Sequence, residues 1–241
     1  MMGILLGVRR LIRRFGYDIT KFKPSSSIVA RKKKLIESFA IDTVLDVGAS
    51  AGFFALEMRR ELNFDGRIYS FEPLAKVFKQ LEFRSKSDDL WEVFNFAIGD
   101  SCEERWINIS ENTFSSSLLD MLPIHQNAAP ESKYKSREKV KVVTLDSVFG
   151  KFYSNSNSIY LKIDVQGFED KVLSGAKSSL DKINTVQLEM SLTNLYRGAS
   201  SLEGLHQYLV NHGYVLVGLE PGFTDKDTGR LLQVDGIYHR Y

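Results

Sequence analysis

The stretch VLDVGASAG (residues 44–52) decides the fold that we expect, because an apolar run stops there in a turn of small residues. Thr43–Val47 predicts a short buried strand, and Gly52–Leu62 has the apolar spacing of a helix. Glycines in such a turn allow a tight bend and a close approach of the backbone to a ligand. The N–H groups that begin the following helix can bind an anion. The stretch therefore predicts a strand–turn–helix unit with a ligand site at its turn.

Strand and helix patterns continue to alternate along the chain. The expected strands are Thr43–Val47, Arg67–Phe71, Trp91–Ile98, Ser158–Ile163, Asn184–Glu189, Tyr214–Leu219 and Val234–His239, and the other expected helices are Leu74–Arg84, Phe168–Leu180 and Leu202–Asn211. This alternation indicates a Rossmann-like α/β fold, with a mainly parallel seven-stranded sheet and helices on both faces. The last two strands have no long helix between them, which predicts an antiparallel strand at one edge.

Length and composition favour one domain with an extension. The chain has 241 residues, of which 43% are hydrophobic, and this is enough for one large core. We assign residues 41–241 to the domain and residues 1–40 to a basic, amphipathic helical extension. Residues 101–143 break the alternation of strands and helices, and they predict an inserted hairpin with a polar loop. A long insertion of this kind often contacts the substrate.

The extension combines positive charge with an apolar face. Residues 1–34 hold ten Lys and Arg and one acid, although the net charge of the whole chain is only +2. Apolar residues recur at helical spacing (Ile4, Leu5, Val8, Leu11, Ile12 and Phe15), and the arginines Arg9, Arg10, Arg13 and Arg14 fall mostly on the other face. Two interpretations stay open. Residues 1–23 could make peripheral contact with anionic lipid, or the helix could dock on the domain with a solvated basic face.

The sequence also limits location and partners. No apolar run approaches the roughly 20 residues of a membrane span, and Arg9 interrupts the apolar start. We therefore expect a cytoplasmic protein that retains its N-terminus, with the inner face of the membrane as an alternative peripheral location. Acids exceed bases in the domain, so we expect no nucleic-acid partner. Cys102 is the only cysteine, which excludes an internal disulfide and a metal site built on thiolates.

The candidate cofactor site begins in the first turn, since ligands of open α/β sheets bind beyond the carboxyl ends of the strands. A dinucleotide template G-x-G-x-x-G starting at Gly48 would need glycine where the chain has Ser50 and Phe53. Phe53 would block a pyrophosphate, but S-adenosylmethionine has none. Asp46 would add a negative charge near the cationic end of that cofactor. The residues assigned to the cofactor in this turn are Asp46, Gly48, Ala49, Ser50 and Gly52.

The next two strands end in residues suited to adenosine. Glu72 lies 24 residues after Gly48, where a carboxylate can accept hydrogen bonds from both ribose hydroxyls, and Pro73 follows it. Ala97 and Ile98 could flank the adenine, and Asp100 could accept from its exocyclic amine. A dinucleotide site uses a carboxylate in the same way, so these residues indicate an adenosine without identifying the reaction.

Acids at the ends of two further strands are the candidate catalytic residues. Asp164 ends a nearly all-apolar strand, so we expect it to face the cleft close to the reactive methyl group. Glu189 ends the following strand and should share the same rim. The two acids could bind sugar hydroxyls, act as a general base or share a divalent metal, and the histidine positions give the metal no clear support. No metal site is therefore assigned.

The inserted segment offers further candidates. His125 is a second possible base, with a plain surface histidine as the alternative interpretation. Ser115, Ser116 and Ser117, together with Gln166, are expected to hold the acceptor through hydrogen bonds.

Taken together, these motifs resemble the FkbM-type methyltransferases, which act on hydroxyls of small molecules and glycans. The matching segments are VLDVGASAG (44–52), YSFEP (69–73), FNFAIGD (94–100), VVTLDSV (142–148), LKIDVQGFEDKVLSGA (161–176) and QVDGIYHR (233–240). The resemblance implies a class I methyltransferase fold, S-adenosylmethionine as methyl donor and usually a hydroxyl as acceptor. The family commonly has Asn where this chain has Ser50, and Glu where it has Gln166, so this chain lacks a carboxylate that the family commonly has at the rim.

The resulting hypothesis is an S-adenosylmethionine-dependent O-methyltransferase for a hydroxyl of a sugar, glycan or glycolipid-type small molecule. Direct in-line displacement would rely on alignment, with Asp164 as the first candidate base. The alternatives are a methylase of nucleic acid or protein, and a non-catalytic module that binds adenosylmethionine or glycan at a membrane surface. Base amino-methylases have a D/N-P-P-Y-like turn after the fourth strand, where this chain has DVQG (164–167).

Overall fold

A seven-stranded sheet forms the centre of the protein, for which the computed structural model describes residues 2–154 and 157–241, with the backbone alone for residues 2–6. Its strand order is β3-β2-β1-β7-β8-β10-β9. The bounds are β1 (Thr43–Val47), β2 (Arg67–Phe71), β3 (Trp91–Phe94), β7 (Ile159–Ile163), β8 (Thr185–Ser191), β9 (Val215–Pro221) and β10 (Gln233–His239). The first five strands in this order (β3, β2, β1, β7 and β8) each pair in parallel with the next. The expected antiparallel strand is β10, which lies one position inside the edge strand β9.

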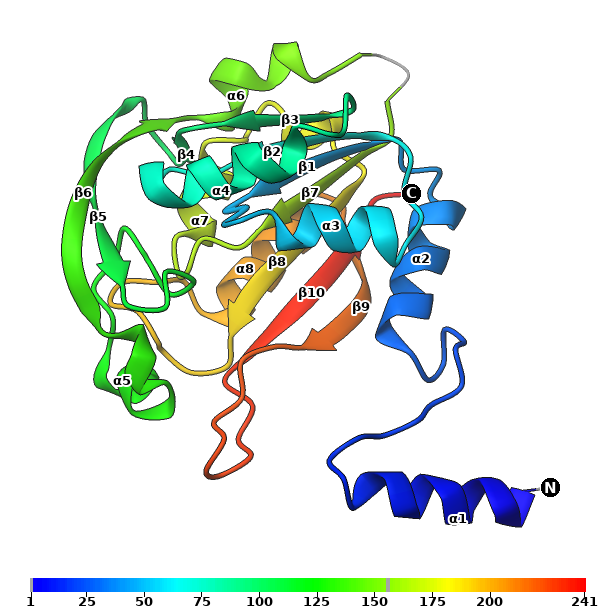
Figure 1. The fold of residues 1–241 in the computed structure, drawn as a ribbon. Coiled ribbons are helices and arrows are strands. Elements are labelled where there is room, and N and C mark those ends of the chain that lie inside the picture. The colour runs from blue at the N-terminus through cyan, green and yellow to red at the C-terminus, as the bar shows by residue number, and fades with distance from the viewer. Residues whose placement is uncertain (1, 155–156) are drawn as a thin grey trace.

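Helices cover both faces of the sheet, as Figure 1 shows. Consecutive residues of β1 point to opposite faces, because side chains alternate along a strand. Val44 packs with α2 (Ile28–Ser38), α3 (Phe53–Arg60) and α4 (Ala75–Ser85). Leu45 packs on the other face with α6 (Leu145–Val148), α7 (Glu169–Ser174) and α8 (Leu202–Asn211). The structure thus confirms the expected Rossmann-like arrangement.

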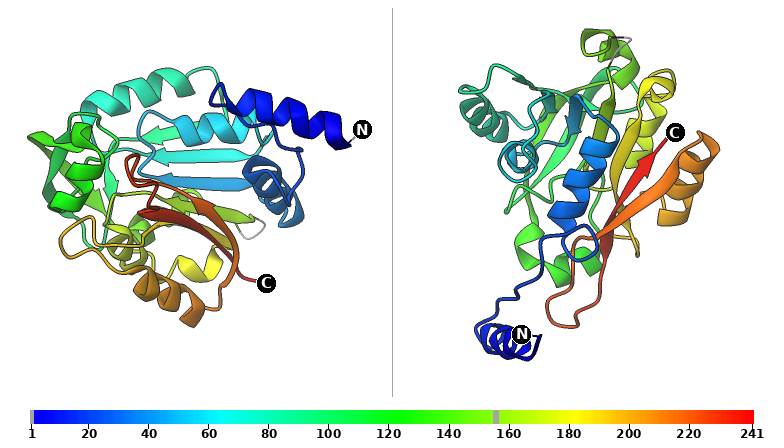
Figure 2. Two further views of the ribbon diagram at one scale, coloured as in Figure 1. Left: turned by 90° about the horizontal axis from the view of Figure 1, so that it is seen from below. Right: turned by 90° about the vertical axis from the view of Figure 1, so that its right-hand side faces the viewer.

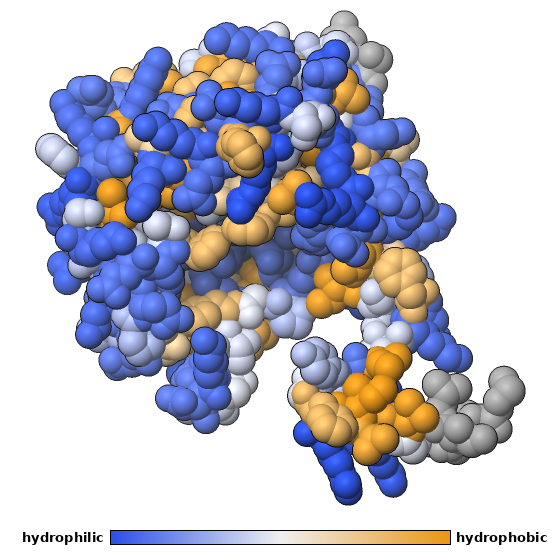
Figure 3. All heavy atoms as spheres, in the orientation of Figure 1, coloured by the Kyte–Doolittle hydropathy of each residue, from blue (hydrophilic) through white to orange (hydrophobic). Residues whose placement is uncertain are grey.

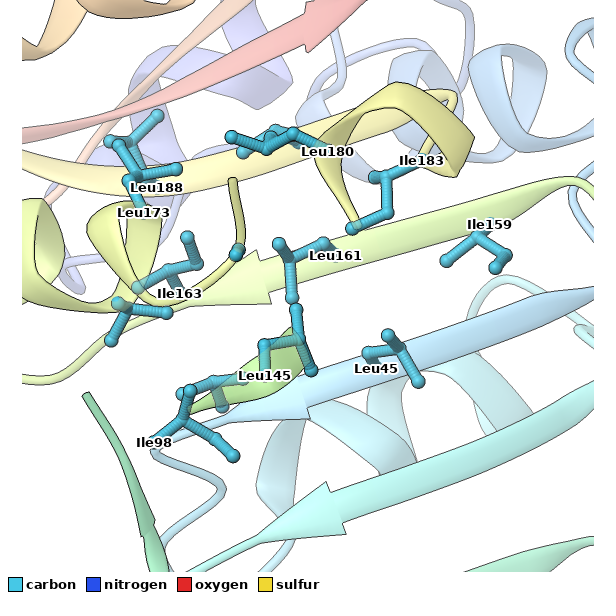
Figure 4. Packing of buried hydrophobic residues seen from close by; sticks show 14 of the residues in the cluster. Leu45, Ile98, Leu145, Ile159, Leu161, Ile163, Leu173, Leu180, Ile183 and Leu188 are labelled. Carbon is cyan, nitrogen blue, oxygen red and sulfur yellow. The ribbon is translucent and has the colours of Figure 1, made fainter. Parts of the chain in front are cut away.

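The hydrophobic cluster that contains Leu45 packs around the strands that lead to the turn at Gly48 (Figure 4). Leu45 and Leu161 are fully buried on neighbouring strands, and Leu145 and Leu173 reach them from the helices. Burial of a leucine side chain contributes about 1.5–3 kcal/mol. The carboxyl ends of β1, β2 and β7 are therefore rigidly positioned relative to one another.

A second sheet, of order β4-β6-β5, stands beyond the carboxyl ends of the first (Figure 1). It consists of β4 (Ala97–Ile98), β5 (Glu103–Ser110) and β6 (Tyr134–Val143). The expected single strand over residues 91–98 is wrong: it splits into β3 and β4, because Ala97 and Ile98 pair with β6. The loop between β5 and β6 carries α5 (Pro123–Ala128) and the short 3₁₀ helix η1 (Pro130–Ser132).

The helix after β7 is shorter than the expected Phe168–Leu180. α7 ends at Ser174, and Gly175 lies against the backbone of Gly99, where a Cβ would come within 1.9 Å of the Gly99 carbonyl oxygen. Two other short 3₁₀ turns, η2 (Phe149–Lys151) and η3 (Leu180–Lys182), complete the connections on this face.

The N-terminal helix α1 (Met2–Arg13) stands away from the sheet domain (Figures 1 and 2). Residues 14–27 connect it to α2, which begins after Ser27, whose hydroxyl accepts a hydrogen bond from the Ala30 N–H. Among the described residues, no helix is both long enough and apolar enough to cross a membrane.

Candidate functional site

The turn after β1 brings the backbone of two strand ends into contact. Gly48 has φ +80°, and a Cβ there would lie 1.8 Å from the carbonyl oxygen of Asp164, so only glycine fits. The Gly48 and Ala49 N–H groups donate to the Phe71 carbonyl at 3.1 and 3.0 Å. Ser50 also adopts a left-handed conformation, with φ +49°. The turn therefore joins the ends of β1, β2 and β7.

Glu72, at the end of β2, is tied to this turn. Its carboxylate accepts the Ser50 N–H at 3.0 Å and the Leu74 N–H at 2.8 Å. The side chain is buried, and burial raises the pKa of Glu72 to about 7, although the two N–H groups oppose that shift. Each carboxylate oxygen keeps a second lone pair for a ligand.

These residues line one cavity, which we call the apolar cavity. Its empty space, together with the open solvent at its mouth, is about 770 Å³. Its polar lining includes Gly48, Ser50, Glu72, Thr113, Ser116, Asp164 and Gln166, and its apolar lining includes Val47, Phe71, Pro73, Leu74, Ala97, Ile98, Ile107, Phe114, Leu118, Val165 and Phe168. The structure thus places Gly48, Glu72 and the expected adenine neighbours Ala97 and Ile98 around one space.

Asp164 stands at the end of β7 in a chain of polar contacts. The amide nitrogen of Gln166 donates to Asp164 at 2.9 Å and to Glu189 at 3.0 Å. The amide oxygen of Gln166 accepts the Tyr196 hydroxyl at 2.7 Å, and the Ser117 hydroxyl donates to the Gln166 carbonyl. Burial and the charge of Asp164 raise the pKa of Glu189. Gln166 therefore holds the two acids together, although Glu189 itself lines neither cavity.

Lys162 is a site residue that the sequence analysis did not assign. Its ammonium lies 3.5 Å from Asp46 and 3.3 Å from Asp164. Burial lowers the pKa of Lys162, but Asp164 and Asp46 outweigh this effect, and the net pKa is raised. The signal available in the sequence was a lysine within the apolar run of β7.

Asp46 lies within β1, before the turn at Gly48, and does not line the apolar cavity. The residue is fully buried, and the Ser70 hydroxyl donates to it at 3.3 Å. Burial raises its pKa, and Lys162 opposes that shift. Asp46 therefore contacts Lys162 and Ser70 and does not face the apolar cavity.

A second cavity, which we call the charged cavity, opens beside the first. The two share Gly48, Ser50, Phe114 and Asp164. The rest of its lining is Ile28, Lys32, Ala49, Phe53, Phe54, Glu57, Lys162, Gln187, Glu220, Pro221 and Asp235. Lys32 is buried and pairs with Glu220 at 3.0 Å and with Glu57 at 3.3 Å. Asp164 therefore stands where a mainly apolar space meets a charged one.

Several predicted site residues lie elsewhere. His125 is buried in the inserted segment, between Tyr196 and Phe223, and not on the surface; burial lowers its pKa to about 4. Asp100 pairs with Lys171 at 3.8 Å. Neither residue lines the apolar cavity or the charged cavity beside it.

The serines of the insertion divide among different positions. Ser116 lines the apolar cavity, Ser117 supports Gln166, and Ser115 binds Asn112. Gly52 lines neither cavity and packs against Trp91, where a Cβ would lie 2.8 Å from the indole ring. Among the described residues, no group of three or more His, Cys, Asp or Glu is arranged to hold a metal ion.

Comparisons with known proteins agree with the sequence motifs. A family model described as "Methyltransferase FkbM domain" matches residues 46–216. No curated protein matches the chain. A solved structure of a candidate methyltransferase from Thermobifida fusca has a TM-score of 0.50 at 11% identity and covers 88% of this chain and 78% of that one. Together with the strand order, this likeness confirms the expected class I methyltransferase fold.

Two other solved structures are similar at slightly lower scores. The methyltransferase FkbM from Methylobacillus flagellatus is 15% identical, with a TM-score of 0.49 and coverage of 81% of this chain. The chain spans 43% of the length of that protein. Fibrillarin from Aeropyrum pernix, solved with natively bound S-adenosylmethionine, is 12% identical with a TM-score of 0.48, over 87% of this chain and 72% of that one.

Proposed function

The chain belongs to the FkbM methyltransferase family, and on that premise we propose that it transfers a methyl group from S-adenosylmethionine to a hydroxyl of a sugar, glycan or glycolipid-type molecule. The observation that carries the cofactor part of this proposal is the position of Glu72. Its carboxylate is fastened to the Ser50 N–H at the apolar cavity, and Asp164 lines the same cavity.

The residues around the apolar cavity fit an adenosine. Glu72 retains acceptor capacity for the two ribose hydroxyls. Phe71, Ala97 and Ile98 offer apolar contact for a flat base. Asp164 supplies negative charge toward a cationic centre. The bound cofactor would supply an activated methyl group, which leaves alignment and proton removal to the protein.

Asp164 is the residue that we assign as general base. It lies at the boundary of the two cavities, so a hydroxyl entering from the charged cavity meets it beside the cofactor space. Lys162 keeps a positive charge next to this carboxylate, and Gln166 fixes one of its oxygens. These two residues act through Asp164 and are positioning residues.

The charged cavity is the space that we assign to the acceptor. Its carboxylates can accept hydrogen bonds from several hydroxyls, and the rings of Phe53 and Phe114 can contact the C–H face of a sugar. His125 is left out of this mechanism, because it is buried away from both cavities.

Titration calorimetry tests the cofactor assignment. We expect S-adenosylmethionine and S-adenosylhomocysteine to bind and NADH not to bind. Glu72→Gln should weaken cofactor binding by about 10- to 100-fold, since a hydrogen bond to a charged group contributes roughly 1.5–3 kcal/mol. Glu92→Gln, an exposed change on the neighbouring strand β3, is the matched control. Binding of NADH in place of adenosylmethionine would overturn the proposal.

The acceptor is tested separately with labelled adenosylmethionine. The full chain is incubated with glycan and glycolipid fractions, with RNA and with a protein mixture. Label in the carbohydrate fractions supports the proposal. Label in RNA or protein alone contradicts the acceptor class but leaves the cofactor assignment standing.

A further inference from the structure

The N-terminal segment exposes an unusual run of apolar side chains. Val8 and Leu11 on α1 are 48% and 56% exposed, and Phe15, Tyr17 and Phe22 after the helix are 73%, 73% and 69% exposed. Figure 3 shows this apolar surface on a helix that stands clear of the domain. Several large apolar side chains exposed together on one segment mark an interaction surface, whereas single exposed ones do not.

Positive charge lies on the opposite side of the same helix. At 100° per residue, Arg9, Arg10 and Arg13 point away from the side that carries Val8 and Leu11. Asp18 pairs with Arg9 at 2.6 Å and with Arg13 at 2.9 Å, which ties the following residues to the helix.

Other cations of this segment keep their charge available. Within the part of the chain that the structure describes, Arg10, Arg14, Lys21 and Lys23 make no ion pair. The segment therefore combines an uncovered apolar face with free positive charge.

We propose that residues 2–23 form a peripheral anchor that lies flat on an anionic lipid bilayer. The apolar side chains would enter the boundary between headgroups and acyl chains, and the arginines and lysines would contact the phosphates. At the boundary of a bilayer, acyl chains lie on one side and anionic headgroups on the other. This arrangement matches the apolar and the basic side of α1. A nucleic acid would engage the arginines but would leave Leu11 and Phe15 exposed to water.

The anchor connects directly to the charged cavity. Residues 14–27 link α1 to Ile28, which lines that cavity, and a link of this length spans at most about 50 Å. Anchoring would thus keep the start of α2 at this cavity within about 50 Å of the anchored helix. The corollary that the acceptor is attached to a lipid rests on the proposed function, whereas bilayer binding does not.

Sedimentation of the full chain with vesicles tests the anchor. The vesicles contain phosphatidylcholine alone, or phosphatidylcholine with 30% phosphatidylglycerol as the anionic component, with partition expected to grow with anionic content. Binding should favour the anionic vesicles and fall as salt rises, because salt screens the attraction. Since α1 is outside the domain core, variants in it should leave thermal unfolding unchanged.

Paired variants separate the two contributions. Arg10→Gln with Arg14→Gln should reduce partition by about 25-fold, at roughly fivefold per cation. Leu11→Asp should reduce it at least about 10-fold, through loss of apolar burial. The matched controls on α4 are Lys76→Gln with Lys79→Gln, and Phe83→Asp, all at exposed positions, and they should leave partition unchanged.

Three results would overturn the anchor. One is equal sedimentation with and without anionic lipid. Another is loss of binding in the arginine variant with full binding by Leu11→Asp, which would make the segment a general polyanion binder. The third is a dimer in sedimentation velocity that Leu11→Asp dissociates, with no vesicle binding, which would make α1 an interface between copies.

Discussion

The two cavities that meet at Asp164 differ in how their walls hold a ligand. The lining of the apolar cavity includes one buried acid, Glu72, whose partners are backbone N–H groups. The charged cavity has lysines and carboxylates that pair with one another, as Lys32 does with Glu220 and Glu57. Backbone N–H donors are held in place by the fold and do not titrate, whereas side-chain pairs can rearrange when a polar ligand enters. The contrast suits a constant cofactor on one side and a polar acceptor on the other.

The largest effect is expected where the two cavities meet. Asp164→Asn should lower turnover by about 10²- to 10⁴-fold, because it removes a general base. Cofactor affinity should fall by a smaller factor than turnover, because the variant also removes the negative charge that faces the cationic centre of the cofactor. The measurement is methyl transfer together with calorimetry of the same preparation, and Asp170→Asn in α7 serves as the control. Full turnover of Asp164→Asn would remove this residue from the mechanism.

A large loss of stability is expected beneath the same boundary. Lys162→Met leaves Asp46 buried without its cation, and such a change costs about 3–5 kcal/mol of unfolding free energy. Lys171→Met removes a partly exposed partner of Asp100 and should cost no more than about 1 kcal/mol. Urea denaturation of both variants measures the difference. Equal stabilities would show that the contacts of Lys162 are dispensable.

The pH dependence of the apolar cavity should follow Glu72. Its pKa is raised to about 7, above the ordinary value of 4.5, so the folded protein binds the proton more tightly than the unfolded chain. The contribution of Glu72 to the free energy of unfolding is therefore fully present below about pH 4.5, the ordinary pKa of the group. It is lost as pH rises through about 7. Cofactor affinity should move the other way and fall by up to about 10-fold between pH 8 and pH 6, because the anion accepts the ribose hydroxyls. Glu72→Gln should flatten both profiles; unchanged profiles would assign the titration to another group.

The smallest effect is expected for a change confined to the charged cavity. Glu220→Gln should leave cofactor affinity within about twofold, since Glu220 shares no partner with Glu72. The same change should weaken use of a hydroxyl acceptor once one is found. A loss of cofactor binding as large as that of Glu72→Gln would mean that one ligand fills both spaces, and the division drawn between them would be wrong.

Local sequence patterns were sufficient to predict which strand ends form the candidate site. The turn at residues 44–52, the acid that ends β2 and the acid that ends β7 are each visible as a short apolar run that stops at a polar residue. Periodicity predicts such strands, and parallel strands bring their carboxyl ends to one edge. The class of fold and the cavity that Gly48 and Glu72 share follow from these rules.

Contacts between residues from distant segments could be identified only in the folded structure. In the sequence, nothing distinguishes the role of Lys162; the pairing of β1 with β7 is what places Asp46 beside it. Likewise, Gln166 bridges two acids because β7 and β8 are neighbouring strands. His125 looked like a candidate base until the insertion buried it against Tyr196. Such contacts depend on how loops pack across many residues, and no spacing in the chain encodes that packing. The strands and helices can therefore be predicted from the periodicity of the sequence. The contacts between side chains at the site are decided by how distant segments pack in the folded chain.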